Sequence, residues 1–177
     1  MIRNTAIAGA AAAVLALVSG CTEQREQPVA ASSATEAAAA GSGLEKLVVA
    51  GLPDQTIGVL AAKQEKKTGD KVVLTGRVKD FVEGAAVLTV ADLSLRDCKT
   101  RGDQCATPWD YCCETKEAMT SGSATVKLSD SAGDPLMQGL KGVGGIDHLV
   151  DIAAEGRVER DGAGNLIVVA EKLYVKQ

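Results

Sequence analysis

The sequence predicts an all-β domain in which five short strands close into a small barrel. Three observations lead to this prediction. From residue 71 onward, apolar and polar side chains alternate with the period of two that is typical of half-buried strands. Five such segments occur, and glycine, aspartate, asparagine or serine bounds them. The strings TGRVKD and EGRVERD place Gly76 and Gly156 at like positions in two of the segments.

The first residues are typical of an export signal. MIRNTAIAGAAAAVLALVSGC joins a basic start at Arg3 to an apolar run and to small residues before Cys21. The ending VSGC resembles the lipobox of bacterial lipoproteins. This resemblance implies that residues 1–20 are a signal peptide and that Cys21 carries diacylglycerol and a further acyl chain such as palmitate, which together anchor a protein stably. The alternative is an ordinary signal peptide in which Cys21 has no role.

The lipoprotein resemblance also implies a location. It places the protein at the cell envelope, lipid-anchored and facing the periplasm. The residue after the lipidated cysteine is Thr22, and in the sorting rule of such proteins an aspartate there would retain the chain at the inner membrane. The outer membrane is therefore favoured over the inner membrane.

Two segments precede the barrel. Residues 21–43 are rich in Ala, Ser and polar residues without an apolar period, which predicts a flexible tether that reaches roughly 25 Å. Residues 44–70 form an N-terminal helical segment, in which Asp54 is placed to cap a short helix and Gly69 to end it. We expect this helix to cover one end of the barrel.

The barrel domain spans residues 71–177. Its expected strands are KVVLTGRVKD, GAAVLTVAD, SATVKLSD, LVDIAAEGRVER and NLIVVAEKLYVK, and a DGAGN hairpin loop joins the last two. Between the third and fourth strands, DPLMQGLKGVGGIDHL predicts a short helix and a glycine-rich turn. Three strands, a helix and two strands form the order of an OB-fold barrel. In that barrel the strands of Gly76 and Gly156 are paired, and glycine inside a strand marks a bend.

Two resemblances follow from these segments. Over about residues 70–176, the strand order and the GRV strings are similar to OB-fold domains of the tRNA-anticodon and helicase type, which implies binding on one face of the barrel and its adjoining loops. The TPWDYCC segment, together with GRV before it and the GN-containing final hairpin, resembles a group of exported bacterial proteins of no established function.

A long insertion, residues 93–123, separates the second and third strands and contains four cysteines. Loops of this length without internal structure are uncommon in compact domains. An even number of cysteines in an exported chain favours disulfides, and closing a loop of about 15 residues contributes about 3 kcal/mol in the chain-entropy model. A bridge between adjacent cysteines would be strained. Two pairings stay open: Cys98–Cys112 with Cys105–Cys113, or Cys98–Cys113 with Cys105–Cys112.

The same thiolates offer a metal site as an alternative. Cysteine sulfur binds zinc or cuprous copper, and the oxygen donors nearby in the sequence are Asp97, Asp103, Asp110 and Glu114. The gaps of six, six and zero residues between the cysteines differ from the paired knuckles of structural zinc sites. A redox-active cysteine pair is the third hypothesis, although the sequence has no CxxC motif.

Composition limits the partners. With 19 basic and 23 acidic residues, the formal net charge is −4, which argues against a polyanionic partner. Aromatic residues are only 2% of the chain, so a platform for base stacking is not expected. These observations predict that nucleic acid is not a partner.

The sequence contains no recognisable catalytic constellation. His148 is flanked by Asp147 and Asp151, but no positioned nucleophile accompanies it. We therefore expect a non-enzymatic protein without a cofactor, unless the cysteines hold a metal ion.

The leading functional hypothesis is a lipid-anchored envelope protein that binds an unidentified partner protein or small ligand. The candidate binding residues at the rim of the insertion are Trp109, Tyr111, Asp110 and Arg77. The first alternative is envelope binding of copper or zinc through the cysteines, and the second is binding of nucleic acid or another oligomer by the OB-fold.

Overall fold

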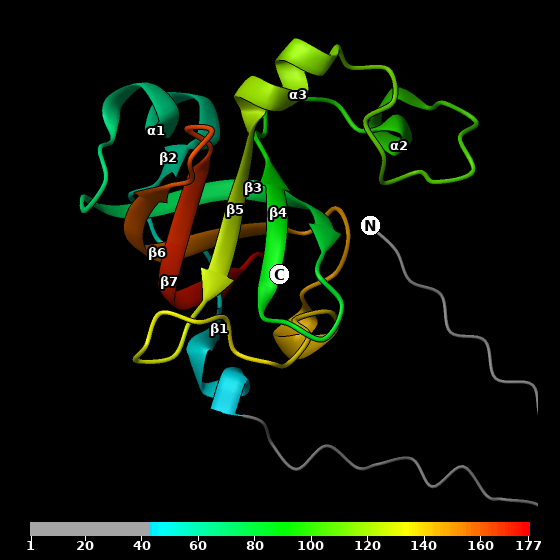
Figure 1. The fold of residues 1–177 in the computed structure, drawn as a ribbon. Coiled ribbons are helices and arrows are strands. Elements are labelled where there is room, and N and C mark those ends of the chain that lie inside the picture. The colour runs from blue at the N-terminus through cyan, green and yellow to red at the C-terminus, as the bar shows by residue number, and fades with distance from the viewer. Residues whose placement is uncertain (1–42) are drawn as a thin grey trace, which may run out of the picture. The chain divides into compact units, whose positions relative to one another are not determined.

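The computed structural model describes residues 43–177 (Figure 1). The predicted signal peptide, the lipidation site at Cys21 and nearly all of the predicted tether lie outside the described residues. Within the described part of the chain, none of the helices has the length and apolar character needed to cross a bilayer.

Five strands form a closed barrel, which confirms the predicted fold class. The strands are β3 (Lys71–Phe81), β4 (Val87–Ala91), β5 (Ser123–Leu128), β6 (Asp151–Arg160) and β7 (Leu166–Val175). β4 pairs antiparallel with both β3 and β5, and β5 then pairs parallel with β7. β6 pairs antiparallel with both β7 and β3 and so closes the sheet. This order of strands, 1-2-3-5-4-1, is that of an OB-fold.

Alternation of buried and exposed side chains explains why these segments are strands. In β5 every second side chain is buried, and β3 shows the same alternation over most of its length. Burying each Leu, Ile or Val contributes about 1.5–3 kcal/mol, so the inward-facing row of each strand fixes its register. The largest fully buried barrel side chains include Leu74, Val78, Leu88, Val90, Leu128, Ile152, Leu166 and Leu173.

The two GRV glycines lie where backbones approach each other closely. A Cβ atom at Gly156 would lie 2.0 Å from the carbonyl oxygen of Val169, and one at Gly76 would lie 2.9 Å from that of Ala91. The register of β6 on β7 shifts between Glu155 and Gly156. The predicted pairing of β3 with β6 is present. Glycine therefore permits the tight strand contacts that a small barrel needs.

The segment before the barrel is only partly helical. It contains a 3₁₀ turn η1 (Gly43–Leu47), two short strands β1 (Val48–Ala50) and β2 (Ile57–Gly58), and the helix α1 (Val59–Glu65). β1 pairs parallel with β7, and β2 pairs parallel with β3. The helix begins after Gly58 and not after the predicted cap Asp54, because β2 first extends the sheet. Asp92 accepts a hydrogen bond from the backbone N–H of Leu60 at 3.0 Å and satisfies the helix start.

The connection between β5 and β6 differs from its prediction. A three-residue 3₁₀ turn η2 (Val143–Gly145) is present in place of the expected short helix. Gly142, Gly144 and Gly145 all have positive φ, a conformation that an α-helix cannot contain.

The predicted insertion between β4 and β5 projects beside the barrel and contains two short helices that the sequence analysis missed (Figure 1). These are α2 (Cys98–Arg101) and α3 (Lys116–Gly122). We call residues 93–122, which end immediately before β5, the cysteine loop.

Candidate metal centre

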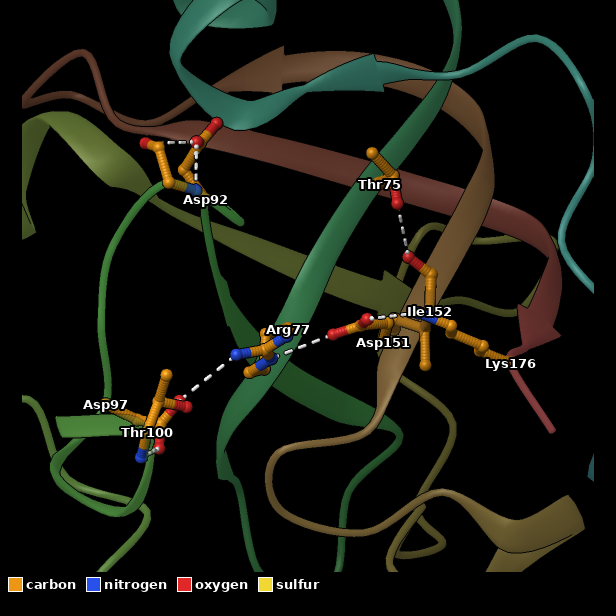
Figure 2. A network of polar contacts seen from close by, with 9 residues as sticks. Thr75, Arg77, Asp92, Asp97, Thr100, Asp151, Ile152 and Lys176 are labelled. Carbon is orange, nitrogen blue, oxygen red and sulfur yellow. Dashed lines mark hydrogen bonds and ion pairs between the residues drawn. The ribbon is translucent and has the colours of Figure 1, made fainter. Parts of the chain in front are cut away.

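A network of charged side chains attaches the cysteine loop to the barrel (Figure 2). Arg77 on β3 donates from Nε to Asp151 at 2.8 Å and from Nη1 to Asp97 at 3.1 Å. Asp97 also caps α2, because it accepts hydrogen bonds from the backbone N–H of Thr100 at 2.8 Å and from its hydroxyl at 2.6 Å. Lys176 adds a contact of 3.2 Å to Asp151. The start of α2 is therefore fixed to two strands of the barrel.

Both carboxylates of this network are buried and charged. The Asp97 side chain is 1% exposed, and the Asp151 side chain is 10% exposed. Burial alone would raise the pKa of Asp97, but hydrogen bonds from Thr100 and Arg77 outweigh it and leave the pKa lowered. For Asp151, burial is likewise outweighed by hydrogen bonds from Arg77 and Lys176, so its pKa is also lowered. The predicted binding residue Arg77 is thus engaged within the protein.

A small hydrophobic cluster gives the loop a second attachment. Tyr111 is 3% exposed and packs with Ala91, Leu95 and Met119. Burial raises the pKa of Tyr111 to about 12, and its hydroxyl has no hydrogen-bond partner among the described residues. Tyr111 therefore belongs to the interior and does not rim a binding surface as the sequence analysis expects.

Backbone hydrogen bonds fold the loop so that distant cysteines meet. The N–H of Cys98 donates to the carbonyl of Asp110 at 2.8 Å, and the N–H of Asp103 donates to the carbonyl of Cys98 at 2.9 Å. The side chain of Asp110 accepts from the N–H of Tyr111 at 2.7 Å. Asp110, another predicted binding residue, therefore shapes the loop from within it.

The four cysteines converge at the surface of this loop. The Sγ atom of Cys112 lies 3.2 Å from that of Cys98, 3.3 Å from that of Cys105 and 3.9 Å from that of Cys113. Cys98 is buried, Cys105 is half-buried, and Cys112 and Cys113 are exposed. Cys113 also donates to the carboxylate of Asp103 at 3.2 Å. We call Cys98, Cys105, Cys112, Cys113 and Asp103 the sulfur cluster.

The described cysteines are free, and none of these contacts has the disulfide bond length of about 2.05 Å. The shortest contacts do not choose between the two predicted pairings, because each pairing contains one of them. The disulfide hypothesis stays a prediction.

Hydrogen bonds within the cluster give the thiols different pKa values. The contact with Cys98 raises the pKa of Cys112 to about 11, and the hydrogen bond to Asp103 raises the pKa of Cys113 to about 12. The hydrogen bond from Cys112 lowers the pKa of Cys98. Only a thiolate is a good nucleophile, so the raised pKa values disfavour attack by Cys112 or Cys113 on a disulfide.

The geometry suits a metal ion. The sulfurs of Cys98, Cys105 and Cys112 all lie within 4.8 Å of one another. Two sulfurs bound at about 2.3 Å to one tetrahedral ion lie about 3.8 Å apart, so the 3.2 Å and 3.3 Å contacts of Cys112 would lengthen by about 0.5 Å when an ion binds. Soft thiolate donors favour zinc and cuprous copper.

Of the four predicted oxygen donors, the structure brings only Asp103 to the sulfurs. Asp97 is bound to Arg77, and Asp110 is turned to the Tyr111 backbone. Glu114 accepts hydrogen bonds from the backbone of Arg96 at 3.1 Å and from the side chain of Arg101 at 2.8 Å.

Trp109 packs the cysteine loop against the barrel mouth, by which we mean the end of the barrel at Phe81, the last residue of β3, and His148. Trp109 also lines a pocket that is separate from the sulfur cluster. Its ring stacks on that of His148 with centroids 4.8 Å apart, and Phe81 meets His148 edge-on at 5.0 Å. The Nδ1 atom of His148 lies 2.7 Å from the carbonyl oxygen of Lys79. A pocket of about 470 Å³ lies beside these rings. Sequence reasoning gave His148 no binding role, and nothing in its neighbourhood along the chain indicates this contact.

The fold and site define an OB-fold-like barrel protein with a thiol-rich insertion. No protein-family model matches the chain, and no curated protein matches it. A search of solved structures finds similarity to the Pot1pC domain of Schizosaccharomyces pombe bound to single-stranded DNA. The identity is 10%, the match covers 70% of this chain and 78% of that chain, and the TM-score is 0.36.

One expectation needs correction. Composition predicted that nucleic acid is not a partner because aromatics are only 2% of the sequence, but the rings of Phe81, Trp109 and His148 gather at one place in the fold. The matched solved structure is itself a complex with single-stranded DNA. Nucleic acid therefore belongs among the ligands to be tested.

Proposed function

We propose that this protein binds a closed-shell thiophilic metal ion, zinc or cuprous copper, through the sulfur cluster, and that it is a binding protein and not an enzyme. The observation that carries the proposal is the convergence of Cys98, Cys105 and Cys112. Their sulfurs lie within 4.8 Å of one another although six residues separate each from the next.

The scaffold supports this function because it holds the ligands in advance. Asp97, the residue before Cys98, is held by Arg77, and Tyr111, the residue before Cys112, is buried in the loop interior. A metal that binds such a site adds its binding free energy to the stability of the loop. Preorganisation lowers the entropy cost of gathering the thiolates.

Exposure of the cluster supports reversible binding. Cys98 is buried on the inner side, while Cys112 and Cys113 are exposed. An incoming thiolate or another ligand can therefore reach a bound ion by way of the exposed sulfurs. This arrangement fits a protein that takes up an ion and passes it on, as well as one that stores it.

Metal retention by cysteine variants tests the proposal. The full chain is isolated under reducing, anaerobic conditions, loaded with zinc or with cuprous copper, passed through a desalting column and analysed for metal. We expect the parent to retain metal and Cys112→Ser to lose most of it, since Cys112 contacts both Cys98 and Cys105. Met137→Leu is the matched control, because Met137 is 85% exposed and lies outside the cluster. Equal retention by all three proteins would refute the proposal.

For the cellular location, we propose a lipid anchor at Cys21 and an outer-membrane attachment facing the periplasm. The VSGC segment supports this proposal. The intact mass of protein extracted from membranes tests it: a chain that begins at Cys21 and carries acyl groups is expected. An unmodified N-terminus at or beyond Cys21, or a chain that retains residues 1–20, would contradict it.

The ring cluster at the barrel mouth favours a second candidate function, the binding of single-stranded nucleic acid. Trp109 is 36% exposed and lines the pocket, and every base has a face that can stack on such a ring. Titration with an oligonucleotide at low salt is expected to quench the fluorescence of Trp109, the sole tryptophan, and high salt is expected to restore it. Unchanged fluorescence at saturating oligonucleotide would dismiss this candidate.

A further inference from the structure

We infer that the sulfur cluster binds two metal ions and that the thiolate of Cys98 bridges them. This inference rests on the proposed function and deepens it. The cluster divides into two groups of donor atoms, and within each group the atoms lie within 4.8 Å of one another. One group is Cys98, Cys105 and Cys112, and the other is Cys98, Asp103 and Cys113. Cys98 is the member they share.

One ion does not account for this donor set. The two groups together supply five donor residues, whereas structural zinc sites use four protein ligands. The two donors outside the first group, Asp103 and Cys113, lie together. The Asp103 carboxylate contacts the sulfur of Cys113 at 3.2 Å, while Cys112 contacts the sulfurs of Cys98 and Cys105. The sulfurs of the adjacent residues Cys112 and Cys113 lie 3.9 Å apart, but the shortest contacts of each are made within a different group.

Cys98 is placed to bridge. It is completely buried at the start of α2, and its backbone is tied to both groups. Its carbonyl accepts from the N–H of Asp103 at 2.9 Å, and its N–H donates to the carbonyl of Asp110, two residues before Cys112. A thiolate sulfur has several lone pairs and can coordinate two ions at once. Binding of both ions releases the protons of the four thiols to solvent, and no electron is transferred.

The two positions differ in donor chemistry, which predicts two separate affinities. The first group offers three sulfurs, and the second offers two sulfurs and one carboxylate oxygen. Softer donor sets hold thiophilic ions more tightly. The first group is therefore expected to fill first, and the second is expected to fill at higher free metal concentration. Loss of Cys113 or Asp103 is expected to affect only the weaker step.

An anaerobic titration with zinc, and separately with cuprous copper, against a competing chelator tests the inference on the full chain. Native mass spectra count the ions per chain at each point. For the parent we expect two steps and two ions at saturation. Cys113→Ser and Asp103→Asn are each expected to retain the tight ion and lose the other. Glu117→Gln, at an exposed carboxylate of α3, is the control that retains both.

The outcomes separate this inference from the proposed function. A single ion at saturation, or loss of all metal in both Cys113→Ser and Asp103→Asn while their circular dichroism matches that of the parent, indicates one site and overturns the two-ion inference alone. Retention of both ions by both variants also overturns it. Absence of bound metal in the reduced parent overturns the proposed function as well.

Discussion

Replacing Arg77 with leucine tests how the cysteine loop is held to the barrel. The substitution leaves the buried carboxylates of Asp97 and Asp151 without their shared partner. Breaking a buried ion pair from one side costs about 3–5 kcal/mol. We expect the lower end, about 3 kcal/mol, because Asp97 keeps its bonds from Thr100 and Asp151 keeps Lys176.

Urea unfolding measures this loss. With an m-value of about 2 kcal/mol/M, a loss of about 3 kcal/mol lowers the midpoint by about 1.5 M. Arg77→Lys is expected to fall between the parent and Arg77→Leu, because an ammonium group lacks the planar fork that reaches both carboxylates. The matched control is Arg157→Leu on β6. Arg157 is exposed and makes a single 3.4 Å hydrogen bond, so the expected change is within about 0.5 kcal/mol.

The reasoning fails if Arg77→Leu unfolds at the same midpoint as Arg157→Leu. Metal retention gives a second readout on the same proteins. Because the buried Tyr111 still attaches the loop, Arg77→Leu is expected to weaken metal binding without abolishing it.

Three further predictions concern the barrel and its mouth. Gly156→Ala is expected to lower the free energy of unfolding by about 3 kcal/mol or more, because the added Cβ atom would lie 2.0 Å from a carbonyl oxygen of β7. Gly162→Ala is the control, because Gly162 has open space around it. Equal urea midpoints for the two variants would contradict the prediction. Stability is expected to fall steeply as the pH drops below about 3.9, because the pKa values of Asp97 and Asp151, the two buried aspartates bound to Arg77, are lowered in the folded state. Their contribution to stability is complete above the unfolded pKa and is lost as the pH falls through the folded pKa values. A urea midpoint that stays constant from pH 5 to pH 2 would refute this prediction. His148→Ala is expected to shift the emission of Trp109 to longer wavelength, since the stacked ring is replaced by water, and an unchanged spectrum would show that the two rings do not stack in solution.

The barrel was predictable because each of its strands shows its pattern of apolar and polar residues within a short stretch of sequence. The alternation of apolar and polar side chains specifies β3 to β7, and the repeated GRV strings indicate two paired strands. The short strands β1 and β2 were missed because strands of three and two residues are too short to show an alternating pattern, and β1 pairs with β7 at the far end of the domain's sequence. The start of α1 was misplaced for a related reason. Its N-terminal partner, Asp92, is 32 residues away from Leu60.

The site was predictable only in its composition. Four cysteines within sixteen residues indicate a sulfur cluster, and the structure brings them together. The roles of the surrounding side chains depend on tertiary contacts. Arg77 and Tyr111 looked like ligand-binding residues from their position, yet the first forms ion pairs with buried carboxylates and the second fills the loop interior. The stacking of His148 on Trp109 could not be predicted from the residues next to His148, because Trp109 comes from another loop.

X-ray absorption at the metal edge tests the central claim most directly. The full chain is loaded anaerobically with zinc or with cuprous copper, and excess ion is removed. We predict a first coordination shell dominated by sulfur, at about 2.3 Å for zinc. A shell composed only of nitrogen and oxygen would contradict the claim, and so would a reduced protein that retains no metal while Cys98, Cys105, Cys112 and Cys113 all react with an alkylating reagent.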